Sequence, residues 1–259
     1  MIMLYFSGTG NSQYIAELFG QKTGAACHSI EKNIDFAALI AANETIGFCY
    51  PVYASRAPRI MRNFVAEHLD KLKNKNIIIF CTQMLFSGDG ARSFAALFPQ
   101  NHLQVIYAEH FFMPNNVSNV FILPLASDKL IKRYIACSER RMQAACHNIK
   151  NGKIKKRGFN VFSQFLGLIQ GVFLTTVEKM ANNSVKITAS CNNCQICIAV
   201  CPMQNLIYED GCITHKHDCT MCYRCVNKCP QKAITVGYHG KVKRQYLYML
   251  NLRKGPPPQ

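Results

Sequence analysis

Short apolar runs alternate with stretches of helical spacing along the first 150 residues. The expected helices span 11–22, 34–42, 58–69, 88–98 and 128–150. The expected strands are "IMLYF" (2–6), "AACHSI" (25–30), "TIGFCY" (45–50), "NIIIFCT" (76–82) and "LQVIYAEHF" (103–111). Strands that alternate with helices predict a parallel sheet covered on both faces, and unbroken runs such as "IIIF" suit doubly buried strands. Residues 1–150 are therefore predicted to form an α/β domain.

The next segment changes from basic to uncharged. "KNGKIKKRG" (150–158) marks a domain boundary, and "GFNVFSQFLGLIQGVFLTTV" (158–177) carries no charge, so we expect residues 151–181 to form a basic linker and an amphipathic helix. Its apolar face consists of Phe162, Phe165, Leu166, Ile169, Val172, Phe173 and Val177. Its opposite face consists of Ser163, Gly167, Gln170 and Gly171. We predict that the apolar face docks on protein. Because basic residues precede it, peripheral contact of 158–177 with a membrane surface is the next alternative, and a transmembrane span is the last.

Nine of the fourteen cysteines lie between Cys191 and Cys229, mostly in a repeated motif. "CNNCQICIAVCP" (191–202) and "CTMCYRCVNKCP" (219–230) share the spacing C-x2-C-x2-C-x3-C-P. A four-iron cluster needs four thiolates, and in two-cluster proteins the cysteine before the proline ligates the other cluster. One predicted ligand set is Cys191, Cys194, Cys197 and Cys229, and the second is Cys219, Cys222, Cys225 and Cys201.

Two other uses of these cysteines are weaker. Zinc ribbons also contain C-x2-C pairs, but they need neither the third cysteine nor the Cys-Pro. A disulfide framework needs export, whereas the first apolar run is too short for a signal peptide, so we expect a reducing, cytoplasmic location. Cys212 falls outside both motifs and is expected to be a packed thiol in the short strand "GCIT".

The cysteine-rich segment resembles a bacterial-type ferredoxin with two [4Fe-4S] clusters. The resemblance covers residues 182–240 and implies a small α+β domain that passes single electrons at low potential. Residues 241–259 follow as a basic tail, expected to be extended or disordered at its proline-rich end.

A glycine loop, "FSGTGNSQ" (6–13), joins the first expected strand to the first helix. Backbone N–H groups at a helix N-terminus form an anion site, and hydroxyl side chains add donors. The dinucleotide pattern fails because Gln13 replaces the third glycine, and no Gly-Lys-Ser/Thr follows for a P-loop. The loop therefore suits the phosphate of a mononucleotide.

This loop resembles the phosphate loop of flavodoxins, with Ser7, Thr9, Gly10 and Ser12 at the patterned positions. The resemblance implies a doubly wound five-stranded sheet of order 2-1-3-4-5 and bound FMN. Two further loops would hold the flavin ring, "YPVYAS" (50–55) and "TQMLFSGDGAR" (82–92), where Met84 and Phe86 are weaker candidates. The implied FMN contacts are Ser7, Thr9, Gly10, Asn11, Ser12, Pro51, Val52, Tyr53, Thr82, Gln83, Gly88, Asp89 and Gly90.

The formal net charge of +16, from 30 Lys+Arg and 14 Asp+Glu, favours acidic partners. Nucleic acid is not expected, because no recognition motif is present.

The whole chain resembles flavodoxin–ferredoxin fusion proteins of anaerobes. That resemblance implies an electron carrier that passes low-potential electrons between two [4Fe-4S] clusters and FMN, with an acidic ferredoxin or reductase as partner. Two alternatives stay open. One is a flavin-dependent reductase that is fed by the clusters and acts on a small molecule. The other is a first domain that serves as a docking platform without flavin. No catalytic nucleophile or carboxylate pair is apparent.

Overall fold

The computed structural model describes residues 1–84, 88–99, 102–120 and 123–251, without the side chains of 171–177, 179, 181–182 and 250. The chain forms two compact units. The first contains Met1–Ser7, Asn11–Met113 and Ile131–Leu174. The second contains Gly8–Gly10, Pro114–Leu130 and Thr175–Gln259. The first unit thus continues past residue 150, and the second takes in residues 114–130 in addition to the cysteine-rich segment.

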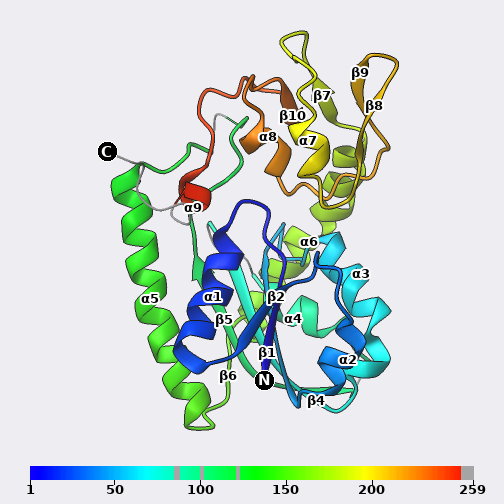
Figure 1. Ribbon diagram of the computed structural model, residues 1–259. Helices are drawn as coiled ribbons and strands as arrows, with labels where there is room; N and C mark the ends of the chain where they lie inside the picture. The colour runs from blue at the N-terminus through cyan, green and yellow to red at the C-terminus, as the bar shows by residue number, and fades with distance from the viewer. Residues whose placement is uncertain (85–87, 100–101, 121–122, 252–259) are drawn as a thin grey trace. The chain divides into compact units, whose positions relative to one another are not determined.

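The first unit is built on a parallel sheet with the strand order β2-β1-β3-β4-β5-β6 (Figure 1). The α/β class and the order of its first five strands agree with the sequence prediction. Each of these strands lies within two residues of the expected range, because its run of apolar residues sets its length. The strands are β1 (Ile2–Tyr5), β2 (Ala26–Ser29), β3 (Thr45–Pro51), β4 (Lys75–Gln83), β5 (Leu103–Phe112) and β6 (Lys155–Lys156).

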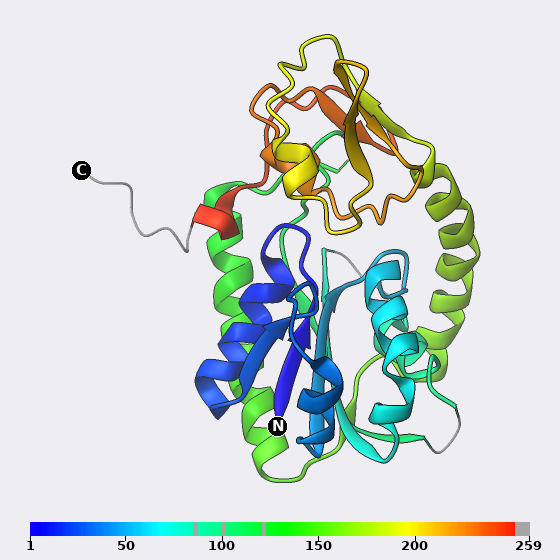
Figure 2. The ribbon, with the colours of Figure 1, turned by 45° about the vertical axis from the view of Figure 1, so that its right-hand side comes forward.

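Helices cover both faces of this sheet, with α1 and α5 on one face and α2, α3 and α4 on the other (Figures 1 and 2). Phe80 of β4 packs edge-on between Phe19 and Phe111, with ring centroids 5.2 and 5.3 Å away. The helices are α1 (Asn11–Thr23), α2 (Phe36–Ala41), α3 (Arg59–Glu67), a 3-10 turn (Leu69–Leu72), α4 (Gly90–Ala95) and α5 (Asp128–Lys150). This core places the carboxyl ends of β1, β3 and β4 side by side.

The sixth strand corrects the predicted five-stranded sheet. Lys155 and Lys156 pair in parallel with the middle of β5. A two-residue charged strand has no apolar pattern, so the sequence predicts only a linker there. Buried Glu109 stabilises the strand, because its carboxylate accepts hydrogen bonds from Lys155 Nζ at 2.7 Å and from Arg157 at 3.2 Å.

Helix α6 (Val161–Asn182) meets the first unit through the opposite face from the predicted one. Ser163 and Gly167 are buried against Gly88, while Phe165 and Leu168 are exposed. Small residues at the contact let the helix backbone approach a loop closely, which large side chains would prevent. The expected apolar docking is therefore wrong for residues 161–170, whereas Val172, Phe173 and Val177 lie outside the described side chains.

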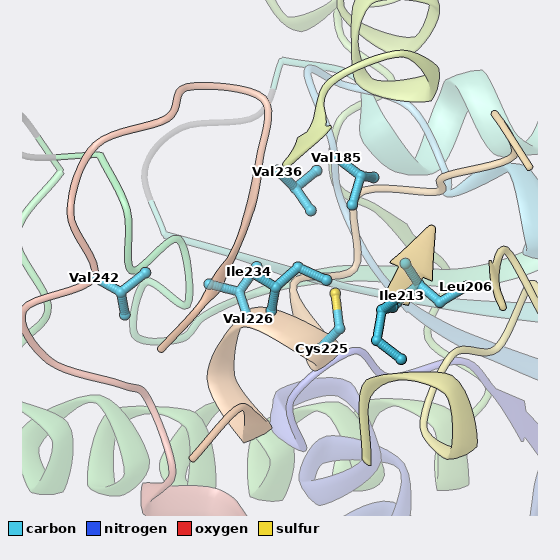
Figure 3. Close-up of a cluster of buried hydrophobic side chains, with 8 residues drawn as sticks. All are labelled: Val185, Leu206, Ile213, Cys225, Val226, Ile234, Val236 and Val242. Atoms are coloured by element: carbon cyan, nitrogen blue, oxygen red, sulfur yellow. The ribbon is translucent and has the colours of Figure 1, made fainter. Parts of the chain in front are cut away.

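The second unit contains two small antiparallel sheets. β7 (Val185–Ile187) pairs with β10 (Ile234–Val236), and β8 (Leu206–Glu209) pairs with β9 (Cys212–His215). Its short helices are α7 (Ile196–Ala199), α8 (Arg224–Lys228) and α9 (Tyr248–Asn251). Its core consists of Val185, Leu206, Ile213, Cys225, Val226, Ile234, Val236 and Val242 (Figure 3).

Two segments outside the cysteine-rich stretch complete this unit. From the basic tail, Val242, Tyr246 and Met249 are buried, and Tyr248–Asn251 form α9. The proline-rich end, to which the expectation applied, lies outside the described residues. From residues 114–130, the Asn116 carbonyl accepts a hydrogen bond from the side chain of fully buried Asn227 at 2.8 Å. Polar side-chain contacts of this kind leave no periodic signal in a sequence.

Candidate functional site

The eight motif cysteines line two cavities in the second unit. The first is lined by Cys191, Cys194, Cys197 and Cys229. The second is lined by Cys201, Cys219, Cys222 and Cys225. Each cavity thus receives three cysteines from one motif and the fourth from the other, in the same grouping as the two predicted crosswise sets.

Apolar side chains form most of the remaining wall of both cavities. In the first cavity they are Ile187, Ile196, Ile213, Ala233 and Ile234. In the second they are Val185, Pro202, Met203, Leu206 and Val236. Within the described ranges, no three or more His, Cys, Asp or Glu side chains converge closely enough to hold a metal ion. The thiols are spread around the walls of a cavity.

The backbone repeats itself between the two motifs with an offset of 28 residues. Three pairs of non-glycine residues 28 apart have positive φ angles that agree within 2°. The pairs are Asn193 and Met221 (54° and 55°), Gln195 and Tyr223 (59° and 57°), and Gln204 and Lys232 (49° and 51°). Each such residue costs about 1 kcal/mol or more in conformational strain. Because the strain recurs at equivalent positions, it belongs to the loop geometry that turns the cysteines inward.

Backbone amides also point at equivalent sulfurs of the two motifs. Asn205 donates its N–H to Cys201 Sγ and Ala233 donates its N–H to Cys229 Sγ, both at 3.3 Å. Met221 donates to Cys219 Sγ at 3.4 Å. Such bonds favour the charged thiolate over the neutral thiol.

Burial disfavours the charged thiolate form of the two most buried motif cysteines, Cys222 and Cys225. It raises the pKa of the Cys222 thiol to about 12, although the nearby Arg224 charge acts in the opposite direction. Burial, together with the neighbouring cysteines, also raises the pKa of Cys225 well above its usual value. These thiols are neutral at pH 7 in the free protein, so a metal that binds them displaces protons.

The expected mononucleotide loops gather at the carboxyl ends of β1, β3 and β4. The first loop leads into the N-terminus of α1 at Asn11, with Gly10 at a φ of 102° that favours glycine. Ser12 and Thr82 connect the first and third loops through a buried hydroxyl–hydroxyl bond of 2.7 Å. Val52 donates its N–H to the Thr82 carbonyl at 2.9 Å, which connects the second and third loops.

The remaining expected contacts fall into two groups. In the first group, the buried residues are Ser7, Thr9, Gln83 and Gly90, the last at the start of α4. The half-buried residues are Asn11, Pro51, Val52 and Tyr53. The Thr9 hydroxyl accepts a hydrogen bond from Asn116 at 3.0 Å. Gly88 and Asp89, in contrast, pack against α6, and Asp89 forms an ion pair with Arg92. Met84 is described at the end of β4, while Phe86 lies outside the described residues.

Helix α6 contributes a residue at this edge that the sequence prediction missed. The Gln170 side-chain oxygen accepts hydrogen bonds from Ser55 Oγ and, at 3.2 Å, from the Gly88 N–H. It thereby joins the loop after β3 to the loop after β4. The prediction counted Gln170 only as part of the polar face of α6, and no local pattern indicates which loops it reaches.

The cysteines outside the motifs differ in burial. Cys49 and Cys81 are fully buried in β3 and β4 and belong to the core of the sheet. Cys27, Cys137 and Cys146 are half-buried. Cys212 is exposed, which corrects the expected packed thiol, because residues of a two-stranded ribbon alternate between a covered and an open face.

Comparison with known proteins identifies the first unit. Residues 2–121 match a family model described as a flavodoxin domain. Together with the strand order, this match shows that the N-terminal part of the chain is a flavodoxin-like domain. The matched region ends before the cysteine-rich segment.

Solved structures similar to this chain include the following three. A two-electron reduced flavodoxin from Megasphaera elsdenii is 21% identical over 42% of this chain and 85% of its own, with a TM-score of 0.38. A flavodoxin, WrbA-like protein from Agrobacterium tumefaciens is 18% identical over 59% and 98%, with a TM-score of 0.39. General stress protein 14 from Treponema denticola, in complex with FMN, is 15% identical over 56% and 96%, with a TM-score of 0.39. No curated protein matches the chain.

Proposed function

We propose that this chain is an electron-transfer protein that binds two [4Fe-4S] clusters in its cysteine-rich unit and FMN at the carboxyl edge of its flavodoxin-like sheet. The observation that carries the proposal is the pair of cavities, each lined by four cysteines in crosswise grouping. A four-iron cluster requires four thiolates, one for each iron.

The residues around each cavity fit such a cluster better than a single zinc ion. Zinc ligands converge to about 2.3 Å from one point, whereas among the described residues no three of these thiols converge closely enough to hold a single metal ion. Apolar side chains line much of each cavity, and the amides of Asn205 and Ala233 donate hydrogen bonds to ligand sulfurs. Hydrogen bonds to sulfur and burial are the means by which proteins set cluster potentials.

The residues at the sheet edge fit a flavin mononucleotide. Backbone N–H groups at the start of α1 and the hydroxyls of Ser7 and Ser12 suit a phosphate. The loops after β3 and β4 would hold the ring through Pro51, Val52, Tyr53, Thr82 and Gln83. Gly88 and Asp89 would support the third loop through α6 and not touch the ring, since both pack against that helix.

Clusters exchange single electrons and a flavin accepts one or two, so the pair of cofactors would connect single-electron to paired-electron traffic. The chain's own residues would bury the cofactors, orient them and adjust their potentials. An acidic redox protein would be the partner, because a net charge of +16 attracts a negative surface and accelerates encounter.

Cofactor content tests the proposal directly. Protein purified without oxygen should contain about eight irons and about eight sulfides per chain, together with one releasable flavin. Stoichiometric zinc without iron would refute the clusters. Iron and sulfide without flavin would refute the FMN part alone and favour a docking role for the first unit.

Pairs of substitutions test the crosswise grouping. Cys194→Ser with Cys229→Ser should remove about half of the iron, because both cysteines line the same cavity. Cys194→Ser with Cys201→Ser should remove nearly all of it, because the two line different cavities. Exposed Cys212→Ser is the matched control and should keep full iron. If Cys194→Ser with Cys229→Ser removed nearly all of the iron and Cys194→Ser with Cys201→Ser removed only half, each motif would hold its own cluster.

A further inference from the structure

Helix α6 presents two faces of different chemistry, and its small, polar face is the one used for packing. Ser163 is 5% exposed and Gly167 is buried. Gln170, on the same side of the helix, accepts hydrogen bonds from Ser55 and Gly88. The first half of α6, which can be followed in Figure 2, is therefore anchored to the flavodoxin-like unit.

The opposite face consists of large apolar residues left exposed. The exposed fractions are 82% for Val161, 67% for Phe162, 61% for Phe165, 62% for Leu168 and 46% for Ile169. At about 100° per residue these five positions span an arc of about 120°. They form one continuous stripe, named here the α6 stripe, directly opposite Ser163 and Gly167.

The chain that leads into the α6 stripe is strongly basic. Residues 140–177 contain seven Lys and Arg and no Asp or Glu. Lys155 and Arg157 are paired with Glu109, but Lys150, Lys153 and Lys156 are exposed. Ile154, among these lysines, is 58% exposed and extends the apolar character of the segment.

We propose that the α6 stripe and the lysines before it bind the surface of an anionic phospholipid membrane, with the helix lying in the interface. Apolar side chains on one face of a helix enter the boundary between headgroups and acyl chains, and nearby lysines bind anionic headgroups. In the described part of the chain, no helix is long and apolar enough to cross a bilayer.

Charge selects this occupant over a second copy of the chain. A two-fold interface through the stripe would bring the same basic segment of both copies together, and each copy carries a formal charge of +16. An anionic bilayer supplies an apolar interior and negative headgroups in one partner. The proposal does not depend on FMN or on the clusters, so it can fail or succeed separately from the proposed function.

Vesicle sedimentation with the full chain, prepared without oxygen, tests the membrane. The chain should sediment with phosphatidylcholine vesicles that contain phosphatidylglycerol, sediment less with phosphatidylcholine alone, and be released partly by salt, which screens the charges. Absence of binding to the mixed vesicles at low salt would overturn the proposal.

Substitutions within the stripe test which surface binds. Phe165→Ser with Leu168→Ser should lower the partition coefficient about tenfold or more, because two large side chains no longer enter the bilayer. The matched control is Ile34→Ser with Leu97→Ser, two residues of the same unit that are 40% and 36% exposed. It should bind like the native chain, and an equal loss in both pairs would refute the assignment to α6.

A second pair of variants separates local charge from net charge. Lys153→Glu with Lys156→Glu should weaken binding to the anionic vesicles far more than Lys32→Glu with Lys73→Glu, although both pairs change the net charge equally. Sedimentation equilibrium measures the oligomeric state and so tests the alternative that a second copy of the chain covers the stripe. A dimer that Phe165→Ser with Leu168→Ser dissociates, without vesicle binding, would assign the stripe to a second copy instead.

Discussion

The two units of this chain obtain their structure from different sources. In the flavodoxin-like unit, β1 is buried along its whole length, β3 and β4 along most of theirs, and packed aromatic rings fill the space beneath the helices. Among its described residues, the cysteine-rich unit has two two-stranded sheets, a core cluster of eight buried residues and eight non-glycine residues with positive φ. Two-stranded ribbons are marginal alone, and small cores usually need a metal, a disulfide or a partner. We therefore expect apolar burial to suffice for the first unit and the second unit to depend on the proposed clusters.

Removal of the proposed clusters should have the largest effect and should affect one unit only. Oxidation of the clusters followed by chelation should unfold the cysteine-rich unit, because structural metal sites contribute roughly 10 kcal/mol to folding. Hydrogen exchange should then show loss of protection in β7–β10 and unchanged protection in β3 and β4. Equal loss in both units would contradict the distinction drawn above.

A cavity in the sheet core should have the next largest effect. Phe80→Ala removes a ring that contacts Phe19 and Phe111, and it should lower the free energy of unfolding of the first unit by about 4 kcal/mol. Urea unfolding followed by hydrogen exchange in β4 measures the change. Leu97→Ala, at a partly exposed position, is the control and should change stability by less than about 1 kcal/mol.

Acid should weaken the first unit through His110. Burial, followed by the charge of Arg157, lowers the pKa of this histidine from 6.5 to about 4. The unfolded chain therefore binds a proton at a higher pH than the folded one, and stability present above pH 6.5 is lost as the pH falls toward 4. The loss should be about 3 kcal/mol.

His110→Gln isolates this contribution, because glutamine does not titrate. The difference in unfolding free energy between the native chain and the variant should change between pH 6.5 and 4 and be constant above pH 7. Burial raises the pKa of Glu109, but the hydrogen bond from Lys155 and the nearby positive charges lower it further below its ordinary value of 4.5. Its contribution is lost at the acid end of this window and below, and because Glu109 is present in both proteins, it cancels in the difference. A pH-independent difference would show that His110 does not titrate during unfolding.

The smallest predicted effect concerns the contact between α6 and the first unit. Gly167→Ala would place a methyl group against the buried carboxylate of Asp89, so the variant should lose about 2 kcal/mol of α6 protection against hydrogen exchange. Leu168→Ala, one position away on the exposed face, should change it by less than about 0.5 kcal/mol. Equal effects of both variants would mean that α6 does not dock through its small residues.

The sequence alone was sufficient for features that depend on local spacing. Runs such as "IIIF" predicted strands because a doubly buried strand must be apolar at every position. The glycine loop predicted the turn into α1, because Gly10 adopts a φ angle that other residues avoid. The repeated C-x2-C-x2-C-x3-C-P motif predicted two crosswise sets of four cysteines, and the cysteines that line the two cavities fall into the same two sets.

Tertiary structure decided the features that depend on partners distant in sequence. Lys155 and Lys156 became a strand because β5 offers a free edge and Glu109 binds their segment, not because of their own propensity. The docking face of α6 was decided by the close approach of Gly88 to Gly167, which outweighed the burial of larger apolar residues. Sequence periodicity shows that a helix has two faces, but which face packs depends on the shape and polar groups of the surface that meets it.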